Sequence, residues 1–325
     1  LPYIAARARK DPRRKIHQAL LLVPVFFPVF SSLVLLGLIV VPVAVITLRK
    51  PAKIHGLTEE KLMDLDPVVL RAILHERTHH TIEVNIYRIM AGKKGISKSF
   101  GETAGRLIDI WKARGLPTDA PDIQWCLNYV GFARMLRTGG DLDLGLELAK
   151  PFTKGEMETV EKLIYGRKSI RQFRDQPVTD EMIDRILHAG LYAPHSCNMG
   201  STRYLVLREP EEWKLVRSDI PLENCVMIVV LQDLRMYKAL NFDELVPQNL
   251  YYDAAATADH ICLMAHALGL GGCWLTHGED TQRRLRDYFG LHKEIVSRNH
   301  IVVGWPDESP IKSQRMKLEE TVLNR

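Results

Sequence analysis

The order and spacing of a few polar motifs most narrowly limit how the second half of this chain can fold. A basic and hydroxyl cluster, R-K-S-I-R, occupies residues 167–171, and a polar turn, A-P-H-S-C-N, follows at residues 193–198. A glycine run, G-L-G-G-C-W, comes at residues 269–274, and a basic tail contains Lys312, Arg315 and Lys317. Cations and a hydroxyl can hold a phosphate group, and glycine lets the backbone approach a ring closely. The series predicts one compact domain that binds a planar cofactor carrying a phosphate.

These motifs, in this order between about Glu156 and Arg325, resemble the FMN-dependent nitroreductase family. The helix expected over residues 180–190, the Ala-rich stretch that begins at residue 253 and the segment I-V-V-G-W-P belong to the same resemblance. It implies an α+β fold, a mixed sheet flanked by helices, that dimerises with FMN at the interface. It also implies ping-pong hydride transfer from NAD(P)H to FMN and on to an organic acceptor. Because the cofactor carries such chemistry, no residue of the chain is predicted to be catalytic.

The resemblance also assigns roles to individual positions. Arg167 and Ser169 match residues that contact the phosphate, and Arg171 matches one beside the flavin ring. The turn would lie against the ring, the glycine run would offer backbone N–H groups near the flavin N5, and the basic tail would hold phosphate. After the turn, G-S-T at residues 200–202 replaces the common Q-P-W, which bears on the substrate pocket more than on the FMN site. The predicted cofactor-binding residues are Arg167, Lys168, Ser169, Arg171, Pro194, His195, Ser196, Asn198, Gly271, Gly272, Cys273, Arg315 and Lys317.

An apolar run without Asp, Glu, Lys or Arg extends from residue 16 to residue 48. A helix of about 20 apolar residues can span a bilayer, so the run predicts a membrane segment, either a tilted span or a re-entrant hairpin. Residues 1–53 carry nine Lys and Arg and one acid, so they hold +8 and the rest of the chain −3 of the net charge of +5. This distribution favours contact with membrane lipid over nucleic-acid binding. We expect a membrane location with the flavin domain on the cytoplasmic side. A re-entrant hairpin would give this orientation, whereas a single span would place the flavin domain on the other side of the membrane.

Four segments are expected along the chain: a basic flank at residues 1–15, the membrane segment at 16–48, a helical region at 49–153 and the FMN-binding domain at 154–325. In the helical region, Asp66 and Pro67 are typical of a helix start, and that helix would run towards Met90. Further helices are expected over residues 102–114 and 122–137. The five cysteines include no C-x-x-C pair, which argues against a metal ribbon and a disulfide scaffold.

The sequence H-E-R-T-H at residues 75–79 has the H-E-x-x-H spacing of a zinc site. His75 and His79 would share a helix face, Glu76 would act as base, and Glu102 could supply a third ligand. The adjacent Arg77 places a cation beside the metal position and favours an ordinary polar helix face. We therefore predict no metal and keep these residues as a weak candidate.

Three functions remain open at the level of sequence. The first is a membrane-anchored FMN oxidoreductase that uses NAD(P)H and an organic acceptor, a lipophilic one included. The second is a non-catalytic subunit of a membrane complex, with further subunits as partners. The third is another chemistry on the same fold, such as reductive dehalogenation or flavin breakdown. Binding of FMN separates the first from the second.

Overall fold

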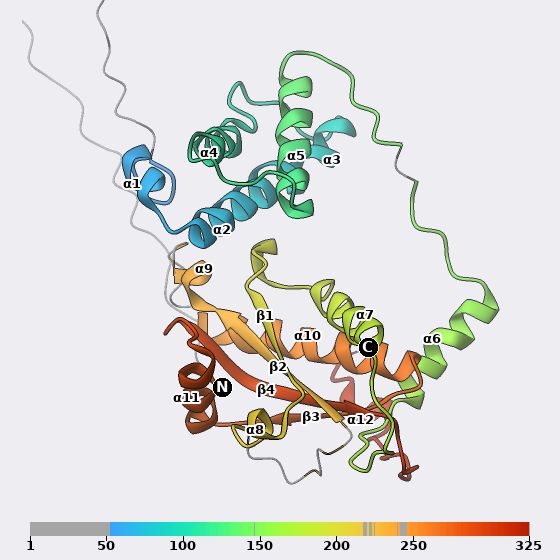
Figure 1. The fold of residues 1–325 in the computed structure, drawn as a ribbon. Coiled ribbons are helices and arrows are strands. Elements are labelled where there is room, and N and C mark those ends of the chain that lie inside the picture. The colour runs from blue at the N-terminus through green and yellow to red at the C-terminus, as the bar shows by residue number, and fades with distance from the viewer. Residues whose placement is uncertain are drawn as a thin grey trace, which may run out of the picture. The chain divides into compact units, whose positions relative to one another are not determined.

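The computed structural model of the protein describes residues 53–145, 147–216, 220, 223, 225–238, 240 and 246–324. An all-helical region comes first in the chain, and a region containing a β-sheet follows (Figure 1). The helical region contains α1 (Glu59–Asp64), α2 (Pro67–Thr78), the π-helical turn η1 (His79–Glu83), α3 (Val84–Met90), α4 (Glu102–Ala113) and α5 (Pro121–Arg137). The helices of the sheet region are α6 (Lys154–Gly166), α7 (Asp180–Leu191), the short turn η2 (Ser196–Asn198), α8 (Pro210–Trp213), α9 (Leu234–Lys238), α10 (Val246–Ala267), α11 (Glu279–Phe289) and α12 (Leu318–Thr321).

Helix α2 begins where the sequence predicted. The Asp66 side chain accepts a hydrogen bond from the Val68 N–H at 2.8 Å, and Pro67 takes the first helical position, where no N–H is needed. From there α2, η1 and α3 follow one another to Met90, and α4 and α5 confirm the next two predicted helices. Their apolar faces bury a cluster that includes Leu70, Ile73, Leu74, Leu107 and Trp111.

The sheet has four strands, β1 (Thr202–Leu207), β2 (Cys225–Asp233), β3 (Gly271–Thr276) and β4 (Ile295–Gly304). Their order is β1-β2-β4-β3, and every neighbouring pair is antiparallel. The α+β fold is confirmed, but the prediction of a mixed sheet is wrong for the described strands. The parallel component is a single bridge between Ser169 and Gly272, because the segment around Ser169 pairs with β3 at one residue only.

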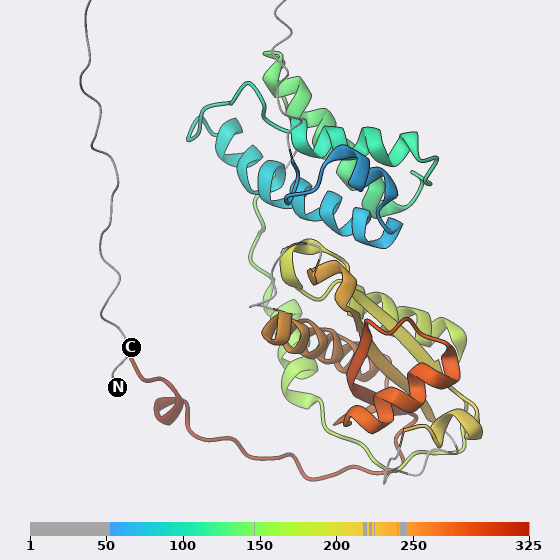
Figure 2. The same cartoon turned by 90° about the vertical axis from the view of Figure 1, so that its left-hand side faces the viewer.

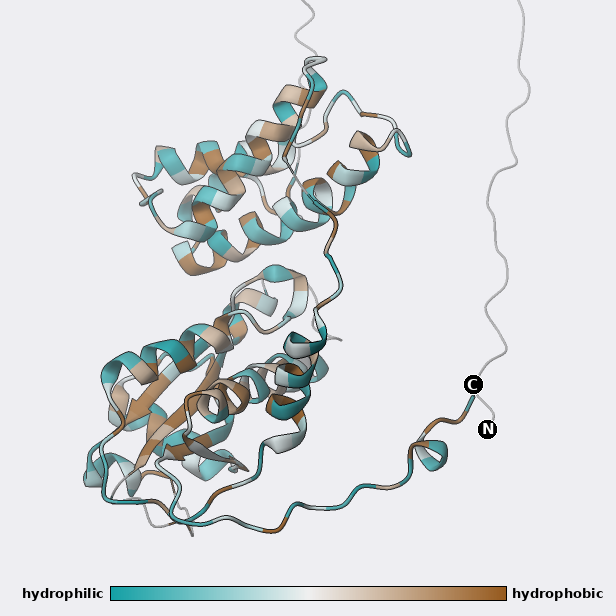
Figure 3. Ribbon diagram, turned by 90° about the vertical axis from the view of Figure 1, so that its right-hand side faces the viewer, coloured by the Kyte–Doolittle hydropathy of each residue, from teal (hydrophilic) through white to brown (hydrophobic). Residues whose placement is uncertain are grey.

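Helices cover both faces of the sheet. Helix α10 packs its Ala254, Ala258 and Ile261 side chains into a cluster with alternate residues of β2 and β4, and α7 contributes Ile186 to it. On the other face, Leu285 of α11 joins a second cluster of strand residues. Figure 3 shows hydrophobic residues along the strands and mixed faces on the surrounding helices. Strand β2 is buried over its whole length, as expected for a strand covered on both sides.

The prediction of a membrane location, with lipid contact and a cytoplasmic flavin domain, is contradicted. Among the described residues, no helix has the length and apolar character needed to cross a bilayer. The predicted span or hairpin at residues 16–48 and the basic flank at 1–15 lie outside the described residues. We therefore do not retain membrane anchoring.

The boundary between the helical region and the FMN-binding domain, at residues 153 and 154, stays a prediction.

Candidate functional site

A basic cavity of about 510 Å³ lies between the end of α6 and the chain that follows β4. Helix α6 ends at Gly166, and the next residues continue as an extended strap, residues 167–171. After β4 the chain runs away from the sheet as an extended C-terminal arm, residues 306–324 (Figure 2). The strap and the start of the arm line the cavity, which is surrounded by the charged or hydroxyl-bearing side chains of Arg167, Lys168, Ser169, Arg171, Lys312, Ser313 and Arg315.

Within the described part of the chain, no acid neutralises the cations of this cavity. None of the five Lys and Arg residues forms an ion pair with any residue that the structure describes, and no acid lines the cavity. Lys312 lies over the Tyr165 ring, with its Nζ atom 5.7 Å from the ring centroid. Five like charges around one cavity repel one another, and a bound anion would offset that repulsion. Lys317, which the sequence placed in the same group, does not line the cavity.

The strap is fixed to the edge strand β3. The Ile170 N–H donates to the Gly272 carbonyl at 3.1 Å, and the Ile170 side chain lies so close to Gly271 that a Cβ atom there would come within 2.6 Å of it. Gly271 is thus required for this packing, whatever a cofactor needs. The Glu308 carboxylate accepts hydrogen bonds from the Arg171 N–H and, at 3.3 Å, from the Gln172 N–H, so the arm also contacts the end of the strap.

A second cavity, of about 270 Å³, shares Arg167, Lys168 and Pro310 with the first. Gly271 and Gly272 line it, so the structure brings two of the predicted glycine-run residues next to the basic cavity. Cys273 is buried, and burial raises the pKa of its thiol. A buried protonated thiol is a poor nucleophile, which agrees with a role for the backbone alone at this position.

The predicted polar turn is held by its own contacts. The His195 Nε2 atom accepts from the Gly200 N–H at 2.8 Å, and its Nδ1 atom lies 3.1 Å from the Ala193 carbonyl. Both ring nitrogens are thus used inside the turn and are not free for a cofactor. Pro194 is exposed. The amide side chain of Asn198 makes no hydrogen bond to a described residue, so it remains available.

Asp253 of α10 hydrogen-bonds the turn, and the sequence analysis did not select this residue. Its side chain is buried and accepts hydrogen bonds from the Ser196 N–H at 3.0 Å, from the Ser196 hydroxyl at 3.1 Å and from the Tyr237 hydroxyl. Burial, followed by the charge of Asp253, raises the pKa of Tyr237, so the phenol stays a donor. The available signal was an acid just before the Ala-rich part of this helix, which also contains Asp259.

The turn and the basic cavity are separate in one chain. Neither of the two adjoining cavities is lined by any residue from 193 to 198. The structure therefore brings together Arg167, Lys168, Ser169, Arg171 and Arg315 with two glycines, and places the turn elsewhere.

The zinc interpretation of residues 75–79 is wrong. No group of three or more His, Cys, Asp or Glu among the described residues could hold a metal ion. The two imidazoles face different carboxylates: His75 Nε2 lies 2.7 Å from Asp122, and His79 Nδ1 lies 2.6 Å from Glu83. Glu102 instead forms an ion pair with an arginine of α5 at 3.3 Å.

Glu76, the proposed base, is a fully buried carboxylate with three partners, of which Arg77 is a cation. It pairs with His55 at 2.8 Å and His80 at 2.7 Å, and it also pairs with Arg77. Burial alone would raise the pKa of Glu76, but these bonds outweigh it and hold the pKa well below its usual range. A carboxylate with so low a proton affinity is a poor general base.

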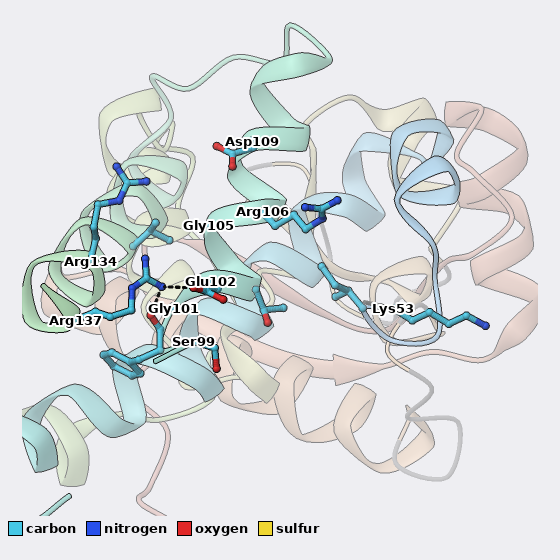
Figure 4. A pocket seen from close by; sticks show the side chains of 13 residues that line it. Lys53, Ser99, Gly101, Glu102, Gly105, Arg106, Asp109, Arg134 and Arg137 are labelled. Carbon is cyan, nitrogen blue, oxygen red and sulfur yellow. Dashed lines mark hydrogen bonds and ion pairs between the residues drawn. The ribbon is translucent and has the colours of Figure 1, made fainter. Parts of the chain in front are cut away.

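A third cavity, of about 680 Å³, lies in the helical region between α4 and α5. Figure 4 shows Arg137 against Glu102, and it shows Lys53 and Arg134 on opposite sides, pointing away from each other. Arg106 is paired with Glu59. Because its cations are paired or divergent, this cavity offers no convergent set of charges for an anion.

The comparisons with known proteins concern the sheet region. The model of the nitroreductase family matches residues 164–224 and 210–305. A protein of Archaeoglobus fulgidus, provisionally named NADH dehydrogenase/NAD(P)H nitroreductase, is 29% identical over 160 residues, which cover 47% of this chain and 88% of that protein. The NADH dehydrogenase of Thermus thermophilus is 25% identical over 191 residues, 49% of this chain and 92% of that protein. A solved structure of a provisionally named nitroreductase from Desulfovibrio desulfuricans, in complex with FMN, is 30% identical, covers 51% of this chain and 96% of that one, and has a TM-score of 0.42.

Proposed function

Because residues 164–305 form a nitroreductase family domain, we propose that the protein is an FMN-dependent oxidoreductase that takes a hydride from NAD(P)H and passes it to an organic acceptor. The basic cavity is the observation that carries this proposal. The names of the relatives, which mention NADH, NAD(P)H and in one case FMN, support the choice of donor and cofactor.

The residues around the cavity fit a phosphomonoester. Arg167 and Arg315 offer planar guanidinium groups, Ser169 offers a hydroxyl, and no carboxylate lines the cavity to compete. Its volume of about 510 Å³ lies within the range of ordinary ligand sites. In the proposal, Lys168 and Lys312 add positive charge around the same phosphate.

The ring of the cofactor would extend from the phosphate towards β3. Gly271 and Gly272 line the adjoining cavity, and β3 is an edge strand of the described sheet. The strap takes the outer carbonyl of Gly272, so only outer backbone groups of β3 that the strap leaves free could hydrogen-bond a ligand. Bound FMN supplies the hydride chemistry, and Gly272, Cys273 and Arg171 would orient the ring and stabilise negative charge on it.

We further infer that two copies of the chain form each site. The turn at residues 194–198 lines neither of these cavities of its own chain, and a second copy could bring its turn to them. The C-terminal arm also needs a partner surface, because Ile311 is 95% exposed and Leu323 98% exposed. Apolar side chains so fully exposed are typical of a segment that packs on another chain.

The proposal is tested by the visible spectrum of the purified protein after addition of FMN, followed by NADH or NADPH without oxygen. We expect bound flavin that loses its absorbance with at least one donor. Flavin that stays oxidised would contradict the use of NAD(P)H. A protein that binds no FMN would contradict the proposal as a whole and leave a scaffold role.

The phosphate contact is tested by Arg167→Gln. Loss of one charge-assisted hydrogen bond costs about 1.5–3 kcal/mol, so FMN should bind roughly 10- to 100-fold more weakly. Lys317→Gln is the matched control, because Lys317 does not line the cavity and should leave the affinity unchanged. Quenching of FMN fluorescence on binding measures both. Equal effects of the two substitutions would show general electrostatic attraction instead of a phosphate site.

A further inference from the structure

Two consecutive residues of the polar turn have an unfavourable backbone. Cys197 has a φ of 52° and Asn198 a φ of 51°, both in the left-handed region. A residue other than glycine pays about 1–3 kcal/mol for such a conformation, although asparagine tolerates it better than most. Such a turn persists only where surrounding groups hold it in place.

Helix α2 of the helical region supplies one of those groups. The His75 Nδ1 atom lies 3.1 Å from the Asn198 carbonyl oxygen, 123 residues away in the sequence. The imidazole is 6% exposed, and Trp125 packs against its ring with an edge-on contact at 6.0 Å between centroids. The ring is therefore a buried donor directed at the backbone of the left-handed pair.

The other ring nitrogen of His75 faces a carboxylate. His75 Nε2 lies 2.7 Å from the Asp122 carboxylate without hydrogen-bond geometry, and the carboxylate accepts a hydrogen bond from the Arg71 Nε–H at 2.6 Å. Burial would raise the pKa of Asp122, but the interactions with His75 and Arg71 outweigh it and hold the pKa well below its usual range. The carboxylate thus stays charged and fixes the ring orientation.

Asp253 and His75 therefore contact the turn at its two ends. The Asp253 carboxylate accepts hydrogen bonds from the Ser196 N–H and hydroxyl, and His75 Nδ1 contacts the Asn198 carbonyl oxygen. Both contacts use atoms other than the Asn198 amide side chain. The strained pair is thereby fixed while that side chain is left for a ligand.

We propose that His75 is a positioning residue for the flavin: it holds the Asn198 carbonyl, so that the Cys197–Asn198 pair keeps its left-handed backbone and presents Asn198 to the cofactor. This inference rests on the proposed function, because it requires that Asn198 contact FMN. It gives the helical region a role in the flavin site, although this region lies outside the residues that match the nitroreductase family. It also explains the histidine of the H-E-x-x-H sequence without a metal.

Packing is the competing explanation, since Leu70, Leu74, Met199 and Tyr237 belong to one buried cluster around this contact. Two substitutions of similar size separate the explanations. His75→Asn places an amide N–H near the position of Nδ1 and keeps the donor to the Asn198 carbonyl. His75→Gln places its amide near the position of Nε2, so it keeps the contact to Asp122 and loses the one to the turn.

The first measurement is hydrogen exchange of the peptide that covers residues 196–200, without added flavin. We expect faster exchange in His75→Gln, because this variant loses the hydrogen bond to the turn. His75→Asn keeps that bond, so its exchange should resemble that of the parent protein. The second is the affinity and midpoint potential of FMN. We expect about tenfold weaker binding and a shifted potential in His75→Gln only, as for the loss of one hydrogen bond.

Equal exchange in all three proteins would overturn the inference, whatever the flavin does. Faster exchange in His75→Gln with unchanged affinity and potential would overturn the positioning role, because the turn would then not affect the cofactor. Equal losses in both variants would assign His75 to packing alone. A parent protein that binds no FMN would refute the proposed function and the positioning role with it, while exchange would still report on the turn.

Discussion

Individual residues decide whether the strap can lie against β3. The Ile170 side chain occupies the space that a side chain at Gly271 would need, whereas a Cβ atom at Gly272 would meet its neighbours at ordinary van der Waals distance. Individual contacts also define the turn. Both ring nitrogens of His195 bond to backbone groups near it in the chain, whereas the amide side chain of Asn198 bonds to no described residue. Composition and motif spacing name these residues, but contacts of a few ångströms determine what each can do.

The contrast between the two glycines gives a direct test. A Cβ atom at Gly271 would come within 2.6 Å of the Ile170 side chain, whereas one at Gly272 would be no closer than 3.8 Å to its neighbours. Gly271→Ala should lower the free energy of unfolding by about 1–3 kcal/mol through overpacking. Gly272→Ala should change it by less than about 1 kcal/mol. Urea denaturation of both variants measures the difference, and equal stabilities would show that the strap is not packed as described.

At the scale of elements, the buried His300 of β4 lies beside the half-buried His277, which follows β3, and the proposed chemistry uses neither. His277 follows β3 and His300 lies in β4, with their Nδ1 atoms 3.1 Å apart. Burial lowers the pKa of His277 to about 4, with Arg298 and Arg284 adding to the effect. Burial and the neighbouring His277 lower the pKa of His300 to about 3. Both rings are therefore neutral in the folded protein near neutral pH.

This pair should make stability fall as the solution is acidified. Unfolded histidines take up protons below about pH 6.5, whereas the folded pair resists protonation until about pH 4, so stability is lost across that interval and is unaffected above it. His300→Gln should remove about 2 kcal/mol of the difference in unfolding free energy between pH 7 and pH 4.5. His292→Gln, at an exposed histidine, is the control and should keep the parent slope. An unchanged slope in His300→Gln would contradict a neutral pair.

At the scale of the whole molecule, the described chain leaves apolar surface without a partner. The arm carries Leu318 at 59% exposure and Leu323 at 98%. The turn at residues 193–198 lines neither the basic cavity nor the adjoining cavity of the same chain. These two observations concern different surfaces and both favour a homodimer.

A double substitution in the arm tests this assembly. Leu318→Ser with Leu323→Ser should raise the dimer dissociation constant about tenfold or more, because burying two leucines contributes about 1.5–3 kcal/mol each. Leu148→Ser is the control, since Leu148 is 93% exposed but lies in the segment between α5 and α6. Sedimentation at several concentrations measures the dissociation constant. A protein that is monomeric before any substitution would contradict the shared site.

Much of the local structure could be predicted from the sequence. Helix starts such as Asp66 with Pro67, and the buried apolar run of β2, depend on nearby residues, so they are readable from the chain alone. Helix α11 was not predicted, although Gly278 and Gly290 bracket it, because most of its residues are charged or polar and its apolar face is narrow. The strictly antiparallel sheet also escaped prediction, since pairing depends on contacts between distant segments.

The sequence by itself determined the order of the elements, the basic strap and the resemblance to the nitroreductases, because these depend on residue type and spacing. Only the tertiary structure decided which groups meet. It brought Lys312 and Arg315 to the strap but not Lys317, placed Asp253 and His75 at opposite ends of one turn, and directed His75 and His79 to different carboxylates. The physical reason is that charge, burial and hydrogen bonding act over a few ångströms, whereas all of these partners except His79 and Glu83 are separated by tens to more than a hundred residues along the chain.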